Sequence, residues 1–554
     1  MPLAGWVPYS KKDAEKYNRL RWWAGRTFGD LLDKAADIYP EKEALVDHGR
    51  RFTYAQVREQ VDRLAVNLLG LDIKPLDRAM VQLPNWSEFV TVYFALQKIG
   101  AIPILLIPRY REYEINHIAR LTEADTWILP IEHRGVDYHP VIQAVLRENP
   151  KTNRVILVRG EEEEGFLNLE TLIQAGTVTD RNRERLARKR PDPMEVGHMS
   201  PTGGTTGLPK MVARTHNDYL CRVEYMARAW ELGSDDTLLI VAPITHDLTF
   251  SIGLCGALFT FGKLVMLDAT DAESICRTIE DEKITATVWV PTLAQRVMRF
   301  EGLKDFNLGS LKKIYCSGGI SSPGLIREVS ERLGCHMLNA YGGTEGMGAL
   351  PRLHYSLDKK CTTVGRPTCP YDTYRILDPE GRECLPNTPG ELSVKGPGVF
   401  SGYYKAPEEN RQIFNKDGFF RTGDQAMVDD AGDIILTGRI KDIIIRGGEN
   451  ISPVEMENLM MAHPDLVAVA VVGMPDPVMG ERACAYIQAR PGVRIGLEEV
   501  NAFLKSRGAS VLQCPERLEL IDKMPVTGAK GLIDKKALRQ RLRETLSANE
   551  QKRL

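Results

Sequence analysis

The first part of the chain alternates helix-like and strand-like patterns of hydrophobic residues. After Phe52-Thr-Tyr54, apolar residues recur every three or four positions, as on one face of a helix, at Val57, Val61, Leu64, Ala65 and Leu68. A strand-like run over 78–83 follows, then a helix over 88–99 that ends at Gly100, then a second apolar run over 101–107. This repeated order of strand and helix predicts an α/β fold with parallel sheets covered by helices.

The pattern changes after about Leu436. A Gly- and Asp-rich β region over 390–433 precedes that point. Beyond it, the periodicity predicts a strand over 443–445, a helix over 453–462, a strand over 467–474 and a helix over 497–506. We therefore expect a large N-terminal domain over 1–437 with a β subdomain, a hinge over 438–442 and a small, mobile α+β C-terminal domain over 443–554. We interpret 161–164 as a solvated acidic loop and 181–190 as a surface linker.

Composition and charge narrow the possible functions. The 554 residues are 43% hydrophobic and 26% charged, and the formal net charge is −2. These values are typical of a soluble globular protein, and no basic stripe points to nucleic acid. We expect no membrane span, because the apolar runs are far shorter than about 20 residues. With no signal-peptide pattern at the N-terminus, we expect a cytoplasmic protein. Ten cysteines, all spaced singly, favour reduced core thiols over a zinc site or a disulfide framework.

The most informative stretch is Ser200-Pro-Thr-Gly-Gly-Thr-Thr-Gly-Leu-Pro-Lys210. Glycines allow several backbone N–H groups to converge on an anion, while threonine hydroxyls and a lysine add donors and charge. This composition predicts a loop that wraps a polyphosphate. A polar surface turn is the alternative from composition alone. A Walker A loop is excluded because Pro209 precedes Lys210, and no G-x-G-x-x-G opens a helix.

The segment from Thr202 to Lys210 resembles the phosphate loop of the adenylate-forming superfamily, which contains acyl- and aryl-CoA synthetases, the adenylation domains of peptide synthetases, and firefly luciferase. Four further motifs follow in the family's order: Tyr341-Gly-Gly-Thr-Glu345, Gly390-Glu391 with Gly402-Tyr403-Tyr404, Phe420-Arg-Thr-Gly-Asp424, and Gly438-Arg-Ile-Lys-Asp442. The overall look is most similar to aryl-acid ligases that activate 2,3-dihydroxybenzoate. The resemblance implies that the chain binds ATP and Mg²⁺ and forms an acyl-AMP.

The resemblance also implies roles for single residues. Thr344 would bind the α-phosphate, Glu345 would hold Mg²⁺, and Asp424 would accept from both ribose hydroxyls with Arg439 beside it. The Gly390 and Gly402-Tyr403-Tyr404 region would be a scaffold. The complete set implied for ATP and AMP is Thr202, Gly203, Gly204, Thr205, Thr206, Gly207, Lys210, Gly318, Gly319, Ile320, Asn339, Ala340, Tyr341, Gly342, Gly343, Asp424 and Arg439.

This sequence departs from the family's pattern at the C-terminal lysine. Members carry P-x-T-x-x-G-K, whereas this chain reads Pro525-Val-Thr-Gly-Ala-Lys-Gly531. We expect Lys530 to bridge the carboxylate and the α-phosphate, with Lys535 as the rival. By resemblance, Lys441 is the pivot of the hinge. A rotation of the small domain about Lys441 would withdraw Lys530 from the active site. The same rotation would bring in Gly447 and Gly448 to line a tunnel for the thiol.

The acid pocket implied by the resemblance consists of His246, Asp247, Ser251, Gly318 and Gly343. Ligases for 2,3-dihydroxybenzoate have asparagine after the histidine, where it bonds the ring 2-hydroxyl. Asp247 cannot donate when ionised, and it would be unfavourable if buried without a partner. This weakens the dihydroxybenzoate assignment and favours benzoate-like or alicyclic acids. Ile320, in place of a small alanine, would narrow the wall.

Three functions follow from this pattern. The first is an acid–CoA ligase, which would use a ring carboxylic acid, ATP and CoA. The second is a ligase that loads the phosphopantetheine of a carrier protein. The third is an adenylate-binding protein with impaired chemistry, which only the changed order at Lys530 supports. A homodimer is compatible with each of them.

Overall fold

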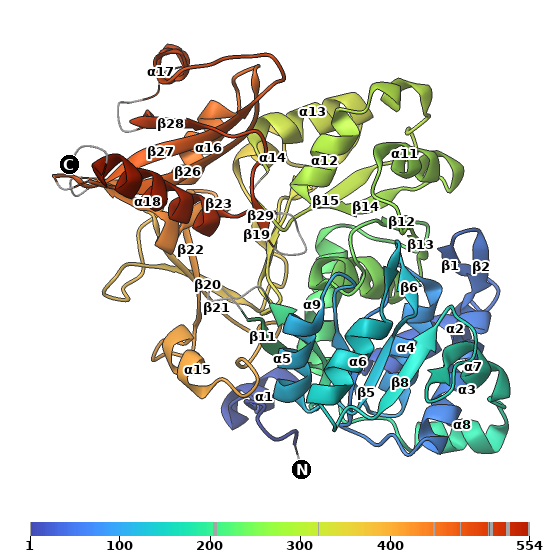
Figure 1. Cartoon of the computed structure of the whole chain (residues 1–554). Coiled ribbons are helices and arrows are strands. Elements are labelled where there is room, and N and C mark those ends of the chain that lie inside the picture. The colour runs from blue at the N-terminus through green and yellow to red at the C-terminus, as the bar shows by residue number, and fades with distance from the viewer. Residues whose placement is uncertain are drawn as a thin grey trace.

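The computed structural model describes residues 2–202, 208–319, 321–446, 449–476, 478–507, 509, 513–527 and 532–551. Two seven-stranded sheets form its large body (Figure 1). The first runs β16 (His336–Asn339), β15 (Lys313–Cys316), β14 (Ala286–Trp289), β12 (Thr237–Ile240), β13 (Lys263–Met266), β1 (Glu43–Asp47) and β2 (Arg50–Thr53). The second runs β11 (Lys210–Thr215), β10 (Val196–Thr202), β4 (Ile102–Leu105), β3 (Arg78–Val81), β5 (Thr126–Pro130), β8 (Arg154–Val158) and β9 (Leu167–Asn168).

All pairs within the two sheets are parallel except the edge pairs β1–β2 and β10–β11. The largest core joins residues of both sheets to α2 (Phe28–Ile38), α3 (Tyr54–Gly70), α4 (Ser87–Lys98) and α9 (His216–Ala229). A second cluster covers the first sheet with α11 (Ala272–Asp281), α12 (Pro291–Met298) and α13 (Pro323–Leu333). A third covers the second sheet with α5 (Glu112–Thr122) and α6 (His139–Glu148). The predicted helix-covered parallel sheets are confirmed.

An antiparallel β region comes after β16, the last strand of the first sheet in the sequence. It consists of β20 (Thr373–Leu377), β21 (Gly390–Lys395), β22 (Phe420–Val428) and β23 (Ile434–Arg439) in that order. A smaller sheet comes between β16 and β20 in the sequence and consists of β17 (Tyr341–Gly342), β18 (Gly348–Leu350) and β19 (Arg366–Pro367). After β23, a short 3₁₀ helix over Ile440–Asp442 leads to the C-terminal part. The proposed hinge over 438–442 stays a prediction.

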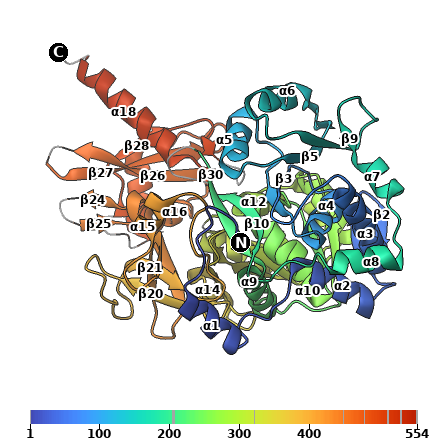
Figure 2. The same cartoon turned by 90° about the horizontal axis from the view of Figure 1, so that it is seen from below.

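The C-terminal part is a smaller α+β lobe beside the body (Figures 1 and 2). Its sheet has the order β25 (Glu449–Ile451), β24 (Ile444–Arg446), β27 (Gly480–Ala489), β26 (Leu466–Asp476), with β28 (Arg517–Leu520) on β27. Its helices are α16 (Pro453–Met460), α17 (Leu497–Ser506) and α18 (Lys535–Gln551), and β29 (Val526–Thr527) pairs with β30 (Leu532–Ile533). The predicted smaller C-terminal domain is confirmed.

Local sequence explains where several elements begin. The Thr53 hydroxyl accepts from the Gln56 N–H, and the Gln56 side chain accepts from the Thr53 N–H, which caps α3 where the hydrophobic stripe begins. The interpretation of 181–190 as a linker was wrong. Asp180–Ala187 forms helix α8, capped by Thr179, with Leu186 as its buried contact. Among the described residues, no helix is long and apolar enough to cross a membrane.

Candidate functional site

The phosphate-loop motif lies on a hairpin at one edge of the second sheet. β10 and β11 pair antiparallel, with Thr202 opposite Lys210. Because β10 and β11 fix both ends of the loop, Thr202 and Lys210 lie opposite each other at its base. Lys210 places its Nζ 5.1 Å from the ring centroid of Tyr403. The predicted nucleotide residues Gly203, Gly204, Thr205, Thr206 and Gly207 lie outside the described residues.

Two motifs that are distant in sequence meet at Asp424. The Tyr341 hydroxyl donates to Asp424 Oδ2 at 2.7 Å, and Arg439 Nε lies 3.2 Å from Asp424 Oδ1. Strands β22 and β23 place Asp424 opposite Arg439. Burial raises the pKa of Asp424, although the charge of Arg439 and the Tyr341 hydroxyl act in the opposite direction. The structure therefore brings together three of the residues predicted to contact the nucleoside.

The Thr344–Glu345 turn is held by buried groups on both sides. Arg214 Nη1 donates to the Thr344 carbonyl at 2.9 Å, and the Phe400 N–H donates to the Glu345 carbonyl at 2.7 Å. The Tyr403 hydroxyl donates to Glu345 Oε1 at 2.7 Å. The two carboxylate oxygens of Glu345, which is 8% exposed, thus differ in surroundings.

Gly319, from the predicted nucleotide set, meets the C-terminal lobe. A Cβ at Gly319 would lie 3.1 Å from Leu532 Cδ2, so strand β30 approaches the body at this point. Gly318 has a φ of +89°, which favours glycine there. Asn339 and Ala340, also predicted, are buried at the end of β16. Ile320 lies outside the described residues.

Three of the predicted acid-pocket residues lie at a π-helix, His246 and Asp247 just before it and Ser251 within it. His246 is half-buried, and its Nδ1 accepts from the Leu248 N–H at 3.2 Å. A neutral ring in this arrangement carries its proton on Nε2. Residues Thr249–Cys255 form a buried π-helix that contains Ser251. Such turns occur often at functional sites.

Asp247 is buried and has two partners, so the cost of a carboxylate buried without a partner does not arise. Arg222 Nη1 donates to Asp247 Oδ2 at 2.9 Å, and the Tyr219 hydroxyl donates to Oδ1 at 2.8 Å. Burial opposes ionisation, yet the charges of Arg222 and Arg214 outweigh it and hold the pKa of Asp247 below its ordinary value. Arg222 Nη2 also lies 3.8 Å from the position of a Cβ at Gly342. This arginine therefore connects the acid-pocket motif to the Tyr341 motif.

Of the two candidate C-terminal lysines, only Lys535 is among the described residues. Lys535 Nζ lies 2.6 Å from Glu457 Oε1, and Glu457 also accepts from the Val471 N–H at 2.7 Å. Lys535 is thus bound within its own lobe. Lys530, Gly447 and Gly448 lie outside the described residues, and their roles stay predictions. Lys441 is exposed, and partial desolvation of its ammonium together with the charge of Arg439 lowers its pKa.

Sequence reasoning missed Arg214, Tyr219, Arg222 and the contact of Tyr403. Arg214 is fully buried and its Nε donates to Asp218 Oδ1 at 2.6 Å. The spacing of four residues from Asp218 to Arg222 was a visible signal, since it places two opposite charges on one face of α9, whereas Arg214 lies in β11 just before that helix. Nothing in the sequence showed that this face is buried.

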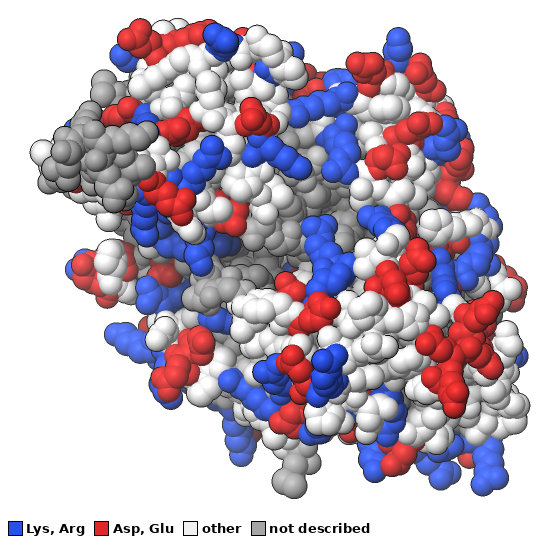
Figure 3. Space-filling view, in the orientation of Figure 1, with Lys and Arg blue, Asp and Glu red and all other residues white. Residues whose placement is uncertain are grey.

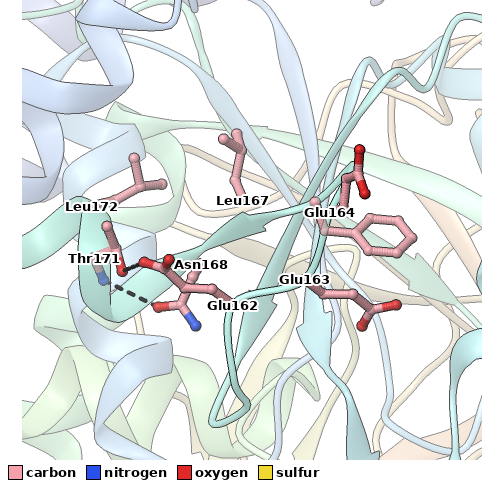
Figure 4. A pocket seen from close by; sticks show the side chains of 8 residues that line it. Glu162, Glu163, Glu164, Leu167, Asn168, Thr171 and Leu172 are labelled. Atoms are coloured by element: carbon pink, nitrogen blue, oxygen red, sulfur yellow. Dashed lines mark hydrogen bonds between the residues drawn. The ribbon is translucent and has the colours of Figure 1, made fainter.

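Two hollows are visible on the surface. Figure 3 shows one between the C-terminal lobe and the body, with Lys and Arg side chains along its rim. The other is open, has a volume of about 370 Å³ and lies beside Glu162, Glu163, Glu164 and α7 (Leu169–Ala175) (Figure 4). This second hollow is at β9, the edge of the second sheet opposite the phosphate hairpin, and it contains no predicted site residue. The 161–164 segment is exposed, as predicted.

Comparison with known proteins agrees with these motifs. The AMP-binding enzyme model matches residues 32–404, and the AMP-binding enzyme C-terminal domain model matches residues 455–530. A 2,3-dihydroxybenzoate-AMP ligase of Bacillus subtilis is 35% identical over 99% of both chains. A 2-hydroxy-7-methoxy-5-methyl-1-naphthoate–CoA ligase of Streptomyces carzinostaticus is 34% identical over 97% of both. A salicyl-AMP ligase / salicyl-S-ArCP synthetase of Mycobacterium tuberculosis is 32% identical, over 98% of this chain and 95% of that protein.

The matched models span most of the large body and much of the C-terminal lobe, and the relatives extend over nearly the whole chain. The resemblance inferred from the motifs is therefore confirmed, and the chain belongs to the AMP-binding enzyme family of adenylate-forming ligases.

Proposed function

We propose that the chain activates a ring carboxylic acid, aryl or alicyclic, with ATP and transfers the acyl group to the thiol of CoA. In the first step, a carboxylate oxygen attacks the α-phosphorus of ATP, and the bond from that phosphorus to pyrophosphate breaks. In the second, the thiol sulfur attacks the acyl carbon, and AMP leaves. The convergence of Tyr341 and Arg439 on Asp424, together with the Thr202–Lys210 hairpin, carries the proposal.

The nucleotide would be held at three places. The Thr202–Lys210 loop supplies backbone donors and one cation to the phosphates. Asp424 accepts from the ribose hydroxyls, since its carboxylate retains acceptor capacity beyond Tyr341 and Arg439. Thr344 donates to the α-phosphate from a backbone held by Arg214. Donors fixed in advance around the reacting phosphorus stabilise the charge of the transition state.

The residues present fit a magnesium ion. Mg²⁺ in such sites takes one or two carboxylates, with phosphate oxygens and waters as its other ligands. Glu345 offers one buried carboxylate whose Oε1 is bonded by Tyr403, which leaves Oε2 as the ligand. When bound, the ion would neutralise phosphate charge as the acid attacks.

Lys530 would supply the ammonium that bridges the acid and the α-phosphate. Two observations support this choice over Lys535. Lys535 is paired with Glu457 inside the C-terminal lobe. Strand β30, which begins just after Lys530 and Gly531, places Leu532 against Gly319 of the predicted nucleotide set. Lys441, in the 3₁₀ turn between the lobes, would be the pivot that removes Lys530 before the thiol enters.

The acid would lie near His246 and Asp247. Because Arg222 balances the charge of Asp247, this carboxylate does not disfavour acids with a 2-hydroxyl. A carboxylate has about four lone-pair sites, and Tyr219 and Arg222 occupy two of them. The rest could accept from an ortho hydroxyl or amino group of the ring.

A second acceptor is supported by the relatives. One is named as a CoA ligase, whereas another is named as a salicyl-S-ArCP synthetase. CoA and a phosphopantetheinylated carrier protein that is not yet acylated present the same phosphopantetheine thiol. The second candidate function is therefore the loading of an aryl carrier protein.

Pyrophosphate release tests both candidates. The protein is incubated with ATP, Mg²⁺ and benzoate, salicylate, 2,3-dihydroxybenzoate, anthranilate or cyclohexanecarboxylate, alone, with CoA or with phosphopantetheinylated aryl carrier protein. We expect release that depends on the acid and is accelerated by CoA. Acceleration by the carrier protein but not by CoA would establish the second candidate. No acid-dependent release from any member of the panel would contradict both.

A further inference from the structure

Tyr403 contacts both charged groups that the proposed function assigns to the ATP phosphates. Its hydroxyl donates to Glu345 Oε1 at 2.7 Å, while its ring lies beneath Lys210, with Nζ 5.1 Å from the centroid. The side chain is 8% exposed. Glu345 and Lys210 come from different parts of the fold, a turn after β17 and the start of β11. Tyr403 is therefore a shared support for an anion and a cation.

The position of Tyr403 is fixed by its own backbone. The Tyr403 N–H donates to Asn410 Oδ1 at 2.8 Å, and Asn410 Nδ2 donates back to the Tyr403 carbonyl at 2.8 Å. Tyr403 also forms a β-bridge with Val212 of β11, the strand that begins at Lys210. The ring therefore stays in register with the phosphate hairpin.

The hydrogen bond also makes the two oxygens of Glu345 inequivalent. Oε1 is bonded by Tyr403, whereas Oε2 points to Gly343, where a Cβ would lie only 2.8 Å from it. A carboxylate held in one orientation suits Mg²⁺, which demands near-ideal octahedral geometry.

We propose that Tyr403 is a positioning residue for adenylation, which orients Glu345 for the metal through its hydroxyl and holds Lys210 through its ring. This inference rests on the proposed function, because it takes Glu345 as the metal ligand. It replaces the purely structural role that the sequence suggested for Gly402-Tyr403-Tyr404. Hydrogen bonds from such partners orient metal-bound carboxylates, and their removal lowers metal affinity or activity on the order of 10- to 100-fold.

Metal binding provides the test, without turnover. Binding of Mn²⁺ to the full-length protein saturated with α,β-methylene-ATP is measured by the loss of the free-ion EPR signal. Tyr403→Phe keeps the ring under Lys210 and removes only the hydroxyl, and we expect Mn²⁺ affinity to fall on the order of 10- to 100-fold. Tyr404→Phe is the matched control, because the neighbouring Tyr404 packs in a different core cluster from Tyr403. We expect it to bind Mn²⁺ like the wild type.

A double-mutant cycle separates positioning from a general structural effect. If Tyr403 acts through Glu345, Tyr403→Phe should weaken Mn²⁺ binding in the wild type but add little to Glu345→Gln. Equal effects of Tyr403→Phe in both backgrounds would overturn the inference, as would unchanged Mn²⁺ affinity in Tyr403→Phe. Wild-type protein that binds no Mn²⁺ with the analogue would overturn the inference together with the assignment of Glu345. Acid-dependent pyrophosphate release would still stand as evidence for the proposed function.

Discussion

Arg222 and Asp247 form an ion pair at 2.9 Å in which neither side chain is more than 5% exposed. The pair lies between the loop that follows β12 and the Tyr341-Gly342 strand, so it joins the proposed acid pocket to the proposed nucleotide site. Two charges removed from water are tolerated because each compensates the other. Their mutual dependence has direct consequences for stability.

Removing one member of this pair should destabilise the protein strongly. We expect Asp247→Ala to lower the free energy of unfolding by about 3–5 kcal/mol, because Arg222 would remain buried without a counter-charge. Urea unfolding followed by circular dichroism measures the change. Asp180→Ala is the control, since Asp180 pairs with Arg183 in an exposed position and should change little. Equal midpoints for the two variants would contradict the account.

Two buried histidines should make the protein less stable in mild acid. Burial lowers the pKa of His198 and of His216 to about 3. The unfolded chain has histidine pKa values of about 6.5. Below that pH its histidines bind protons that His198 and His216 do not bind in the folded protein. The stability from these groups is therefore complete above about pH 6.5 and is lost as the pH falls towards 3.

The measurement is the free energy of unfolding from pH 7 to pH 4. We expect it to fall with a slope of up to about 1.4 kcal/mol per pH unit for each histidine. His198→Gln should flatten the slope, while the control His48→Gln, at an exposed position, should not. A slope in His198→Gln that matches the wild type would exclude His198 as a source of the acid sensitivity.

The two C-terminal lysines should have separable effects. We expect Lys530→Ala to lower acid-dependent pyrophosphate release strongly, on the order of 100-fold or more, and to leave transfer from supplied acyl-AMP to the thiol largely intact. Lys535→Ala should instead weaken the C-terminal lobe, because the half-buried Glu457 loses its cation. The assignment fails if Lys535→Ala abolishes adenylation in a folded protein and Lys530→Ala does not.

The elements that sequence patterns predicted well are those whose signals are local. The helix over 497–506 matches α17 in full, and α3 begins at the Tyr54 that opens its hydrophobic stripe. Helix α8 was missed because seven of its eight residues lie outside the core, so periodicity could not distinguish it from a polar linker.

In the site too, the residues that could be predicted are those whose sequence signal is local. The motifs around Lys210, Tyr341 and Asp424 were visible because each is a contiguous run of residues. The contact of Arg222 with Asp247 joins positions 25 apart, and that of Tyr403 with Glu345 joins positions 58 apart. Such contacts depend on how β11, α9 and the antiparallel sheet are packed, and no local pattern records that.

Transfer of an oxygen isotope tests the central claim, attack of a carboxylate on the α-phosphorus, most directly. The acid that gives the fastest pyrophosphate release is labelled with ¹⁸O in its carboxyl group and incubated with the protein, ATP, Mg²⁺ and the thiol acceptor. The products are then analysed by mass spectrometry. We predict one ¹⁸O in AMP and none in pyrophosphate. Label in inorganic phosphate with formation of ADP, or unlabelled AMP alongside the thioester, would contradict adenylation as the step that activates the acid.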